Sequence, residues 1–254
     1  MMGFVKFIYI IFTFVIGFAF CSCKPNNKVD KIDSDTCVVD CQEINHNIVE
    51  TQNGLKFIYP NFSKIDLVCG TMPTKNDNSV ILVVEAAYTG ECLDQFKHTN
   101  IAGDHVSDGK RYRGYKCSRN TGAFVYYNGN WKFCYKQYSN ELDSAANYGG
   151  AAFAQELIIK NKELLKTPRK DSSKNIFRVL GEVSGKLCIV ESDTIVTFGE
   201  FKNKLIAANV ENAIYLDMGN GWNHGWYRAA ADSIIELYPK THNYCTNWIT
   251  FYEK

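Results

Sequence analysis

The sequence predicts a single α+β domain, in which a mixed, largely antiparallel sheet carries a few flanking helices and one βαβ crossover. Three observations support this fold class. Short runs rich in β-branched and aromatic residues recur between turn signals from about residue 48 onward. Asn128-Gly129 separates two such runs, which indicates a β-hairpin because both central residues of the turn need positive φ. One capping box, Thr197-Phe198-Gly199-Glu200, starts a helix between two further strands.

The first predicted strands cover residues 55–59, 65–69 and 80–87. The last of them, Val-Ile-Leu-Val-Val-Glu-Ala-Ala, is apolar on both faces, so we expect a central strand that is buried on both sides. Glu85 falls at its C-terminal end, where a carboxylate must find partners or shift its pKa. The Asn128-Gly129 turn then joins the strands 122–127 and 131–135 into a hairpin.

A short helix and two strands are predicted next. Residues 141–147 form the helix, which Gly149-Gly150 can end. Residues 153–160 and 177–183 have the composition of strands. A basic, polar loop at 166–174 joins these two strands.

A strand at 186–191 leads into the second predicted helix. Thr197 is its N-cap, and Glu200 reaches back to complete the capping box. Asn209 can end the helix. The apolar residues that recur at helical spacing are Phe198, Phe201, Leu205 and Ala208.

The helix is followed by a strand at 212–216, and a strand–helix–strand unit of this length predicts a right-handed crossover between parallel strands. Ligands gather at the carboxyl ends of parallel strands. The pattern therefore places Asp217 and the glycine-rich segment 218–221 at a binding edge. A structural role, in which Asp217 caps backbone amides, fits the same pattern equally well.

The N-terminal residues predict an export signal followed by a tether. Residues 7–20 form an apolar stretch that suits a signal-peptide core and falls short of the roughly 20 residues that span a bilayer. Phe20-Cys21-Ser22-Cys23 resembles a bacterial lipoprotein signal, so we expect lipidation of Cys23 and anchoring in the cell-envelope membrane, on its periplasmic or cell-surface face. Plain secretion and an uncleaved N-terminal anchor are the alternatives. The predicted organisation is a signal peptide at 1–22, a polar tether at 23–44 and one folded domain at 45–254.

The composition argues against several classes of protein. The 28 basic and 27 acidic residues balance, whereas a protein that binds nucleic acid through bulk charge is usually basic. No EF-hand, Walker loop, GxSxG or HExxH motif is present, so we predict no metal and no cofactor.

The cysteines indicate bridges or buried thiols. An even number in an exported protein permits disulfides. Zinc is the rival interpretation because Cys37 and Cys41 have finger-like spacing, but no second pair with matching spacing follows. The cysteines beyond the lipidation site are Cys37, Cys41, Cys69, Cys92, Cys117, Cys134, Cys188 and Cys245.

The densest polar segment, residues 212–228, carries a family resemblance. Its start, Asn-Ala-Ile-Tyr-Leu-Asp-Met-Gly, resembles the NAxNLDGGGS segment of the phosphodiester glycosidase family. The similarity covers about residues 80–228. Two departures, Glu85 in place of an asparagine and Met218-Gly219-Asn220 in place of a triple glycine, imply a divergent bacterial member with its own substrate. Similar segments occur in the family's order at 88–92, 103–108, 120–124, 177–181 and 186–191.

The resemblance implies an exported glycoside hydrolase that cleaves a sugar–phosphate diester or a related glycan linkage. Such a reaction needs a cation for the phosphate, a carboxylate beside the developing oxocarbenium ion and a base for water. Arg178 fits the first role, although a structural ion pair is its alternative. His105 is a candidate acid or base, with a simple hydrogen bond as its alternative. The candidate carboxylates, expected to converge with Arg178 on one site, are Asp217, Glu85 and, in reserve, Asp104.

The predicted substrate is a carbohydrate or glycosyl phosphate. Gln155 is a polar residue on an apolar strand and is a candidate to bind a hydroxyl group. The aromatic residues within 222–227 offer faces on which a sugar can stack at the rim of the site, with core packing as the alternative. The second functional hypothesis is a non-catalytic, glycan-binding surface lipoprotein on the same fold. The predicted substrate-binding residues are Asn120, Gln155, Gly219, Trp222, Asn223, Trp226 and Tyr227.

Overall fold

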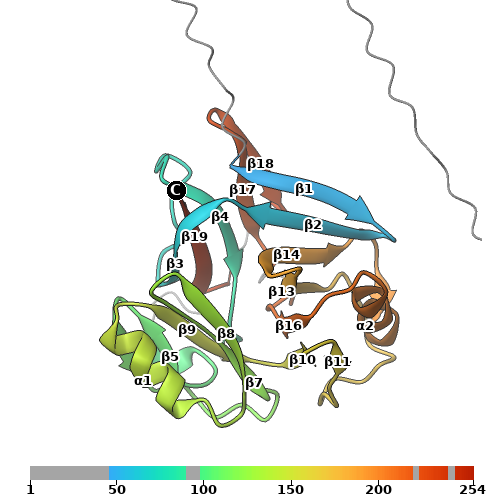
Figure 1. The fold of residues 1–254 in the computed structure, drawn as a ribbon, viewed down its shortest axis with the longest axis horizontal. Coiled ribbons are helices and arrows are strands. Elements are labelled where there is room, and N and C mark those ends of the chain that lie inside the picture. The colour runs from blue at the N-terminus through green and yellow to red at the C-terminus, as the bar shows by residue number, and fades with distance from the viewer. Residues whose placement is uncertain (1–45, 90–97, 220–222, 240–243) are drawn as a thin grey trace, which may run out of the picture. The chain divides into compact units, whose positions relative to one another are not determined.

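The computed structural model describes residues 46–254, apart from 90–97, 220–222 and 240–243 (Figure 1). All of these residues belong to one unit of the chain, Gln42–Lys254. The predicted signal peptide and tether, Cys23 and Trp222 lie outside the described residues. In the part that the structure describes, none of the helices has the length and apolar character needed to cross a membrane.

The largest sheet has seven strands in the order β1-β2-β14-β13-β16-β10-β11. A two-residue turn at Ser184-Gly185, with positive φ at both residues, joins β13 to β14 and sets Arg178 opposite Glu191. The hairpin therefore fixes an ion pair across two neighbouring strands. The strands are β1 Asn47–Gln52, β2 Leu55–Pro60, β14 Lys186–Ser192, β13 Arg178–Val183, β16 Asn212–Tyr215, β10 Leu157–Lys160 and β11 Glu163–Leu164.

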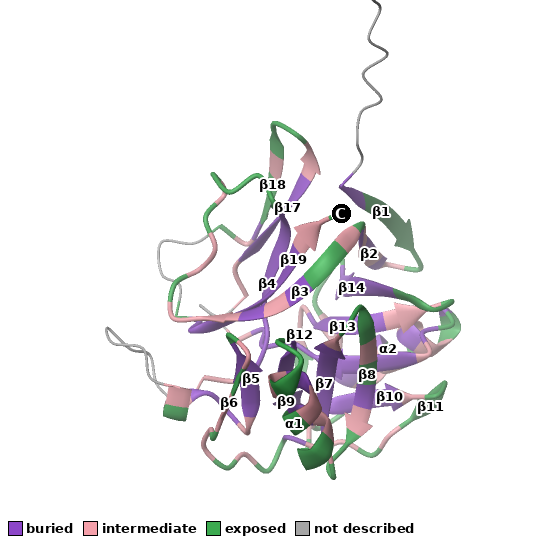
Figure 2. Cartoon of the chain, turned by 60° about the vertical axis from the view of Figure 1, so that its left-hand side comes forward, coloured by how far each residue is buried: buried purple, intermediate pink, exposed green. Residues whose placement is uncertain are grey.

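A second sheet, called here the β4 sheet, has the order β18-β17-β4-β19-β3. Every residue of β4 is buried, as its apolar sequence predicts (Figure 2). Its partners β17 and β19 come from the C-terminal part of the chain. The strands are β18 Ser233–Leu237, β17 Gly225–Ala230, β4 Val80–Glu85, β19 Asn247–Glu253 and β3 Phe62–Cys69.

A third sheet, called here the β9 sheet, has the order β6-β5-β9-β7-β8. The predicted Asn128-Gly129 hairpin is confirmed: φ is 52° and 72° at its two turn residues, and β7 pairs with β8 around them. The strands are β6 Lys110–Tyr112, β5 His105–Ser107, β9 Ala151–Gln155, β7 Gly122–Tyr127 and β8 Asn130–Tyr135, and a separate two-stranded sheet pairs β12 Lys174–Asn175 with β15 Val196–Thr197.

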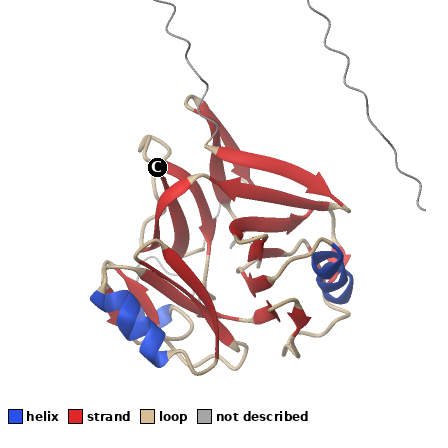
Figure 3. Ribbon diagram, viewed as in Figure 1, coloured by secondary structure: helices blue, strands red, loops and turns tan. Residues whose placement is uncertain are grey.

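Two α-helices lie among the described residues, α1 Ser139–Asn147 and α2 Phe198–Ala207, with one short 3₁₀ helix, η1 His98–Asn100 (Figure 3). The capping box of α2 is confirmed, because the Thr197 hydroxyl accepts from the Glu200 amide and the Glu200 carboxylate accepts from the Thr197 amide. The apolar face of α2 packs against the seven-stranded sheet through Phe198, Phe201 and Leu205.

The fold is largely β, so the predicted α+β class with flanking helices and a βαβ crossover is wrong. The ladders between the described strands of all three large sheets are antiparallel. The two strands of the predicted crossover, β14 and β16, do run in the same direction, but β13 lies between them and is antiparallel to both. The hairpin partner of β14 thus occupies the place where a parallel neighbour would pair.

The predicted strand 153–160 is also two strands in the structure. β9 belongs to the β9 sheet and β10 to the seven-stranded sheet, so the chain passes from one sheet to the other at Glu156. Gln155 and Glu156 are both fully buried, and the Gln155 side-chain oxygen accepts from the Glu156 amide. A buried polar pair therefore marks the crossing point between two sheets.

Candidate functional site

Three strands from three different sheets end at one backbone carbonyl. Ala86, which follows β4, accepts a hydrogen bond from the Asp217 amide at 3.2 Å and from the Gln155 side chain at 3.4 Å. Asn247 holds the next residue, because its side chain both accepts from the Ala87 amide at 2.7 Å and donates to the Ala87 carbonyl at 3.0 Å. The C-terminal ends of β4, β9 and β16 therefore meet in one place.

Asp217 is the carboxylate at this junction. It is 8% exposed, and its Oδ1 accepts from the Gly219 amide at 3.1 Å. Burial raises the pKa of Asp217 to about 6, and the hydrogen bond from Gly219 and the charges of Arg169 and Arg119 oppose that rise. A carboxyl group that titrates close to neutral pH can act as a base or as an acid in this range.

Arg169 comes from the basic loop that the sequence predicts between two strands, and it packs deep in the junction. Its Nη2 donates to the Tyr88 hydroxyl at 2.6 Å, and its guanidinium lies 4.2 Å from the centre of the Tyr215 ring. Its Nε lies 3.4 Å from a carboxylate oxygen of the fully buried Glu156. These contacts occupy Arg169 largely with the protein itself.

Arg119 is the more open cation. Its side chain is exposed, and its guanidinium lies 5.8 Å from the centre of the Tyr88 ring. Its charge acts on Asp217 and lowers the pKa of that carboxyl group. We call this set the strand-end cluster; it comprises Tyr88, Arg119, Glu156, Arg169, Tyr215 and Asp217.

A buried triad of two glutamates and one arginine lies beside the strand-end cluster. Arg178 Nη1 contacts both carboxylate oxygens of Glu85 at 2.6 and 2.7 Å, and its Nε donates to Glu191 at 2.8 Å. Burial raises the pKa of Glu85 to about 8, against the attraction of Arg178. Arg178 and Glu85 are fully buried, and a further donor of Arg178 reaches the Asn223 carbonyl at 3.4 Å. Arg178 thus forms the ion pair that was the alternative to an open phosphate ligand.

Asp104 and His105 have their contacts elsewhere. Asp104 forms an ion pair with Arg111 at 2.8 Å. His105 contacts His98 through its Nε2 at 2.9 Å and the Gly103 carbonyl through its Nδ1 at 3.1 Å. Burial lowers the pKa of His105 to about 4, so its imidazole is neutral at neutral pH. The expected convergence on one site therefore includes Glu85, Arg178 and Asp217, while these two residues contact other groups.

Asn120 has the clearest signature of a ligand contact among the predicted binding residues. It is 7% exposed, and neither its side-chain oxygen nor its nitrogen has a partner among the described residues. Such unpaired buried amides are rare in proteins. Gly103 lies so close that an added Cβ would stand 2.5 Å from the Asn120 nitrogen.

The remaining predicted binding residues have mainly structural contacts. Trp226 is fully buried and Tyr227 is 8% exposed, so both pack in the core rather than at a rim. Gln155 bonds the junction backbone, as described above. Gly219 donates its amide to Asp217, and Asn223 has a buried side-chain oxygen without a partner among the described residues.

A surface cavity of about 840 Å³ lies apart from these groups. It contains none of the predicted site residues, and its aromatic side chains are Tyr59, Phe62, Tyr126 and Trp131. The cavity lacks a buried carboxylate beside a cation, whereas the strand-end cluster has one in Asp217. The lining also includes Ile48, Glu50, Pro60, Asn61, Ser63, Gly129, Val183, Ser184, Gly185, Lys186, Leu187 and Lys254.

Comparison with known proteins gives a likeness of fold. The chain is similar to the catalytic domain of zebrafish N-acetylglucosamine-1-phosphodiester alpha-N-acetylglucosaminidase, auto-inhibited by its pro-peptide, with a TM-score of 0.53 and 14% identity over 82% of this chain and 81% of that one. A hypothetical protein from Synechocystis matches with a TM-score of 0.47 and 9% identity, over 82% of this chain and 61% of that one. No protein-family model and no curated protein matches the sequence.

Proposed function

We propose that this protein is a hydrolase that cleaves a glycosyl phosphodiester or a related glycan linkage, with Asp217 as its central carboxylate. The observation that carries the proposal is the setting of Asp217: nearly buried, with a pKa raised to about 6, and within reach of the charges of Arg119 and Arg169. The motif around residues 212–219 and the likeness of fold to a phosphodiester glycosidase catalytic domain support the same reaction class.

The roles follow from charge and exposure. Arg119 is exposed beside Asp217, so it binds the phosphate oxygens, whereas the donors of Arg178 are taken by the two glutamates. Asp217 stabilises the positive charge that develops on the sugar or activates water. Asn120 supplies an unpaired amide that can bind a sugar hydroxyl. Arg178 and Glu85 position the junction on which Asp217 lies.

The first experiment is a release assay over a panel of glycosyl phosphodiesters and bacterial wall polymers. Asp217→Asn is nearly isosteric and should lower kcat on the order of 10³-fold, because it removes the charge alone. Arg119→Gln should weaken turnover of phosphate-bearing substrates, whereas Arg113→Gln, at another exposed arginine, serves as the matched control. Full activity in Asp217→Asn would show that Asp217 is a structural cap.

The pH profile offers a second check on the same residue. If the ionised carboxylate is the working form, kcat/KM falls about tenfold per pH unit below the pKa of Asp217, which is about 6. A profile that stays flat between pH 7 and pH 4 on a substrate without titrating groups would contradict this role.

Glycan binding without catalysis is the second candidate, and the aromatic side chains of the surface cavity favour it. Trp131 and Phe62 are partly exposed there and can stack on sugar rings. Glycan-array binding that is lost in Trp131→Ala and kept in Asp217→Asn, with no turnover of any substrate, would support this function over hydrolysis.

The cellular location belongs to the same proposal. The chain is exported and anchored through a lipid on Cys23, because its N-terminal sequence has the order of a lipoprotein signal. Mass spectrometry of the membrane fraction should find an acylated N-terminal Cys23. A mature chain that retains residue 1, or an unmodified secreted form, would contradict the anchor.

A further inference from the structure

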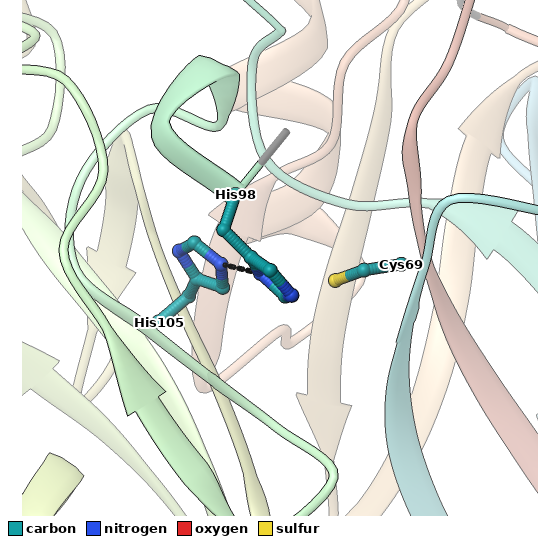
Figure 4. A group of neighbouring side chains, drawn as sticks. All are labelled: Cys69, His98 and His105. Carbon is teal, nitrogen blue, oxygen red and sulfur yellow. Dashed lines mark hydrogen bonds between the residues drawn. The ribbon is translucent and has the colours of Figure 1, made fainter. Parts of the chain in front are cut away.

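Three metal-ligating side chains meet outside the strand-end cluster. Cys69 at the end of β3, His98 in η1 and His105 at the start of β5 each offer one ligand atom, and these atoms lie within 4.8 Å of one another (Figure 4). His105 is buried, while the other two are partly exposed. An ion can therefore reach the group from solvent.

The surrounding contacts orient the two histidines. The Nδ1 of His105 bonds the Gly103 carbonyl at 3.1 Å, which makes Nδ1 the donor and leaves the lone pair of Nε2 directed at the cluster. The His98 ring stacks on Tyr112 with 3.5 Å between the ring centres and an angle of 2°. Tyr112 is itself paired with His105 across β5 and β6. A hydrogen bond from the second ring nitrogen to a backbone carbonyl, as His105 makes, is the usual way in which a metal-ligating histidine is oriented.

We propose that Cys69, His98 and His105 form a binding site for Zn²⁺. A tetrahedral zinc ion at typical bond lengths places two nitrogen ligands about 3.3 Å apart and a nitrogen about 3.6 Å from a sulfur. The two histidine nitrogens lie 2.9 Å apart, so a shift of a few tenths of an ångström admits the ion. The thiol of Cys69 gives up its proton to solvent, and a water molecule fills the fourth position.

One thiolate and two imidazoles favour a cation of intermediate softness, such as zinc. Thiolate and imidazole suit zinc, whereas calcium and magnesium prefer oxygen ligands. The ion would connect the β4 sheet, through β3, to the β9 sheet, through β5. This site is independent of the proposed hydrolase function, because Asp217, Arg119 and Arg169 take no part in it.

The test is a Co²⁺ titration of the full metal-free chain. We expect one equivalent to bind with tetrahedral visible bands and a thiolate-to-cobalt charge-transfer band, and equimolar Zn²⁺ to displace it. Cys69→Ser should abolish the charge-transfer band, and His105→Ala should weaken binding by more than about 100-fold. Cys134→Ser, which replaces another partly buried cysteine, should change neither.

A second measurement tests the site in the unmutated chain, so that it does not depend on whether a variant folds. In the unmutated chain, Zn²⁺ should slow alkylation of Cys69 by iodoacetamide and leave Cys134 unaffected. Three results would each overturn the proposal: no charge-transfer band with Co²⁺, the same band in folded Cys69→Ser, or a disulfide at Cys69 in peptides mapped from the unreduced protein.

Discussion

The carboxyl group of Asp217 lies in a place that is unfavourable for its charge. The residue is 8% exposed, and burial raises its pKa from 3.8 to about 6. The native state therefore binds more protons than the unfolded chain between these two values. The protonated Asp217 side chain therefore adds to the free energy of unfolding. This contribution is complete below pH 3.8 and is lost as the pH rises through 6.

This sign gives a prediction for stability. Asp217→Asn keeps an oxygen that can accept from the Gly219 amide but has no charge to bury. The difference in unfolding free energy, variant minus wild type, should grow by about 2 kcal/mol between pH 4 and pH 7. Urea unfolding at both pH values measures it, with the exposed Asp193→Asn as control. A difference that shrinks as the pH rises would contradict the burial argument.

The triad predicts an asymmetry between its members. Arg178→Met leaves Glu85 and Glu191 buried without their cation and should cost about 3–5 kcal/mol of unfolding free energy. Glu85→Gln should cost less, because Glu191 still pairs with Arg178 and the glutamine oxygen can still accept a hydrogen bond from the guanidinium. Chemical denaturation of both variants tests this, and equal losses would contradict it.

At the scale of elements, the β13–β14 hairpin determines which residues face each other. The turn at Ser184-Gly185 has φ values of 50° and 70°, so its register places Glu191 opposite Arg178 six residues into the strand. An added Cβ at Gly185 meets no atom within 4 Å. Any cost of a substitution there is therefore conformational.

The turn supports a prediction on register and stability. Gly185→Ala should cost about 1 kcal/mol, because non-glycine residues disfavour positive φ. Ser184→Asn creates the preferred Asn-Gly turn and should raise Tm. Thermal unfolding measures both effects. Destabilisation by Ser184→Asn would show that the serine makes a contact that the turn geometry does not reveal.

Elements whose signals are local could be predicted from the sequence. The Asn128-Gly129 hairpin, the buried strand β4 and the capping box of α2 depend on residues close to one another in the chain. The partners of the strands could not be predicted, because they are set by contacts between distant segments. The prediction of a crossover failed for this reason: nothing in residues 186–216 indicates that β13 pairs between β14 and β16.

The candidate site divides in the same way. Glu85 and Asp217 were identifiable because each lies at or just beyond the C-terminal end of an apolar strand. Glu191 could have been found by counting outward from the Ser184-Gly185 turn, which pairs it with Arg178. Arg169 was missed because it lies in a polar loop whose composition is that of solvent-exposed connections. Its place beneath Tyr88 is set by tertiary packing.

At the scale of the whole molecule, side chains of single residues connect the sheets. Asn247 of β19 satisfies both backbone groups of Ala87, next to the carbonyl that receives Asp217. Asn247→Ala should cost about 2–4 kcal/mol, because it leaves two buried backbone groups unpaired. It should also lower the activity of the strand-end cluster, whose strands it aligns.

Thr250 provides the matched control in the same strand. It is fully buried like Asn247, but its hydroxyl has no partner among the described residues. Thr250→Val should therefore be neutral or stabilising. Denaturation of the two variants side by side separates the loss of the hydrogen bonds from a general sensitivity of β19 to substitution.

The position of β4 between β17 and β19 has a consequence for the order of synthesis (Figure 1). The chain is made from its N-terminus, so Val80–Glu85 emerges long before Gly225–Ala230 and Asn247–Glu253 exist. Pairings between strands that are distant in the sequence form slowly, and an apolar strand whose partners are missing is prone to aggregate. β17 and β19 cover the two edges of β4, so β4 keeps open apolar edges until both of these strands have been made.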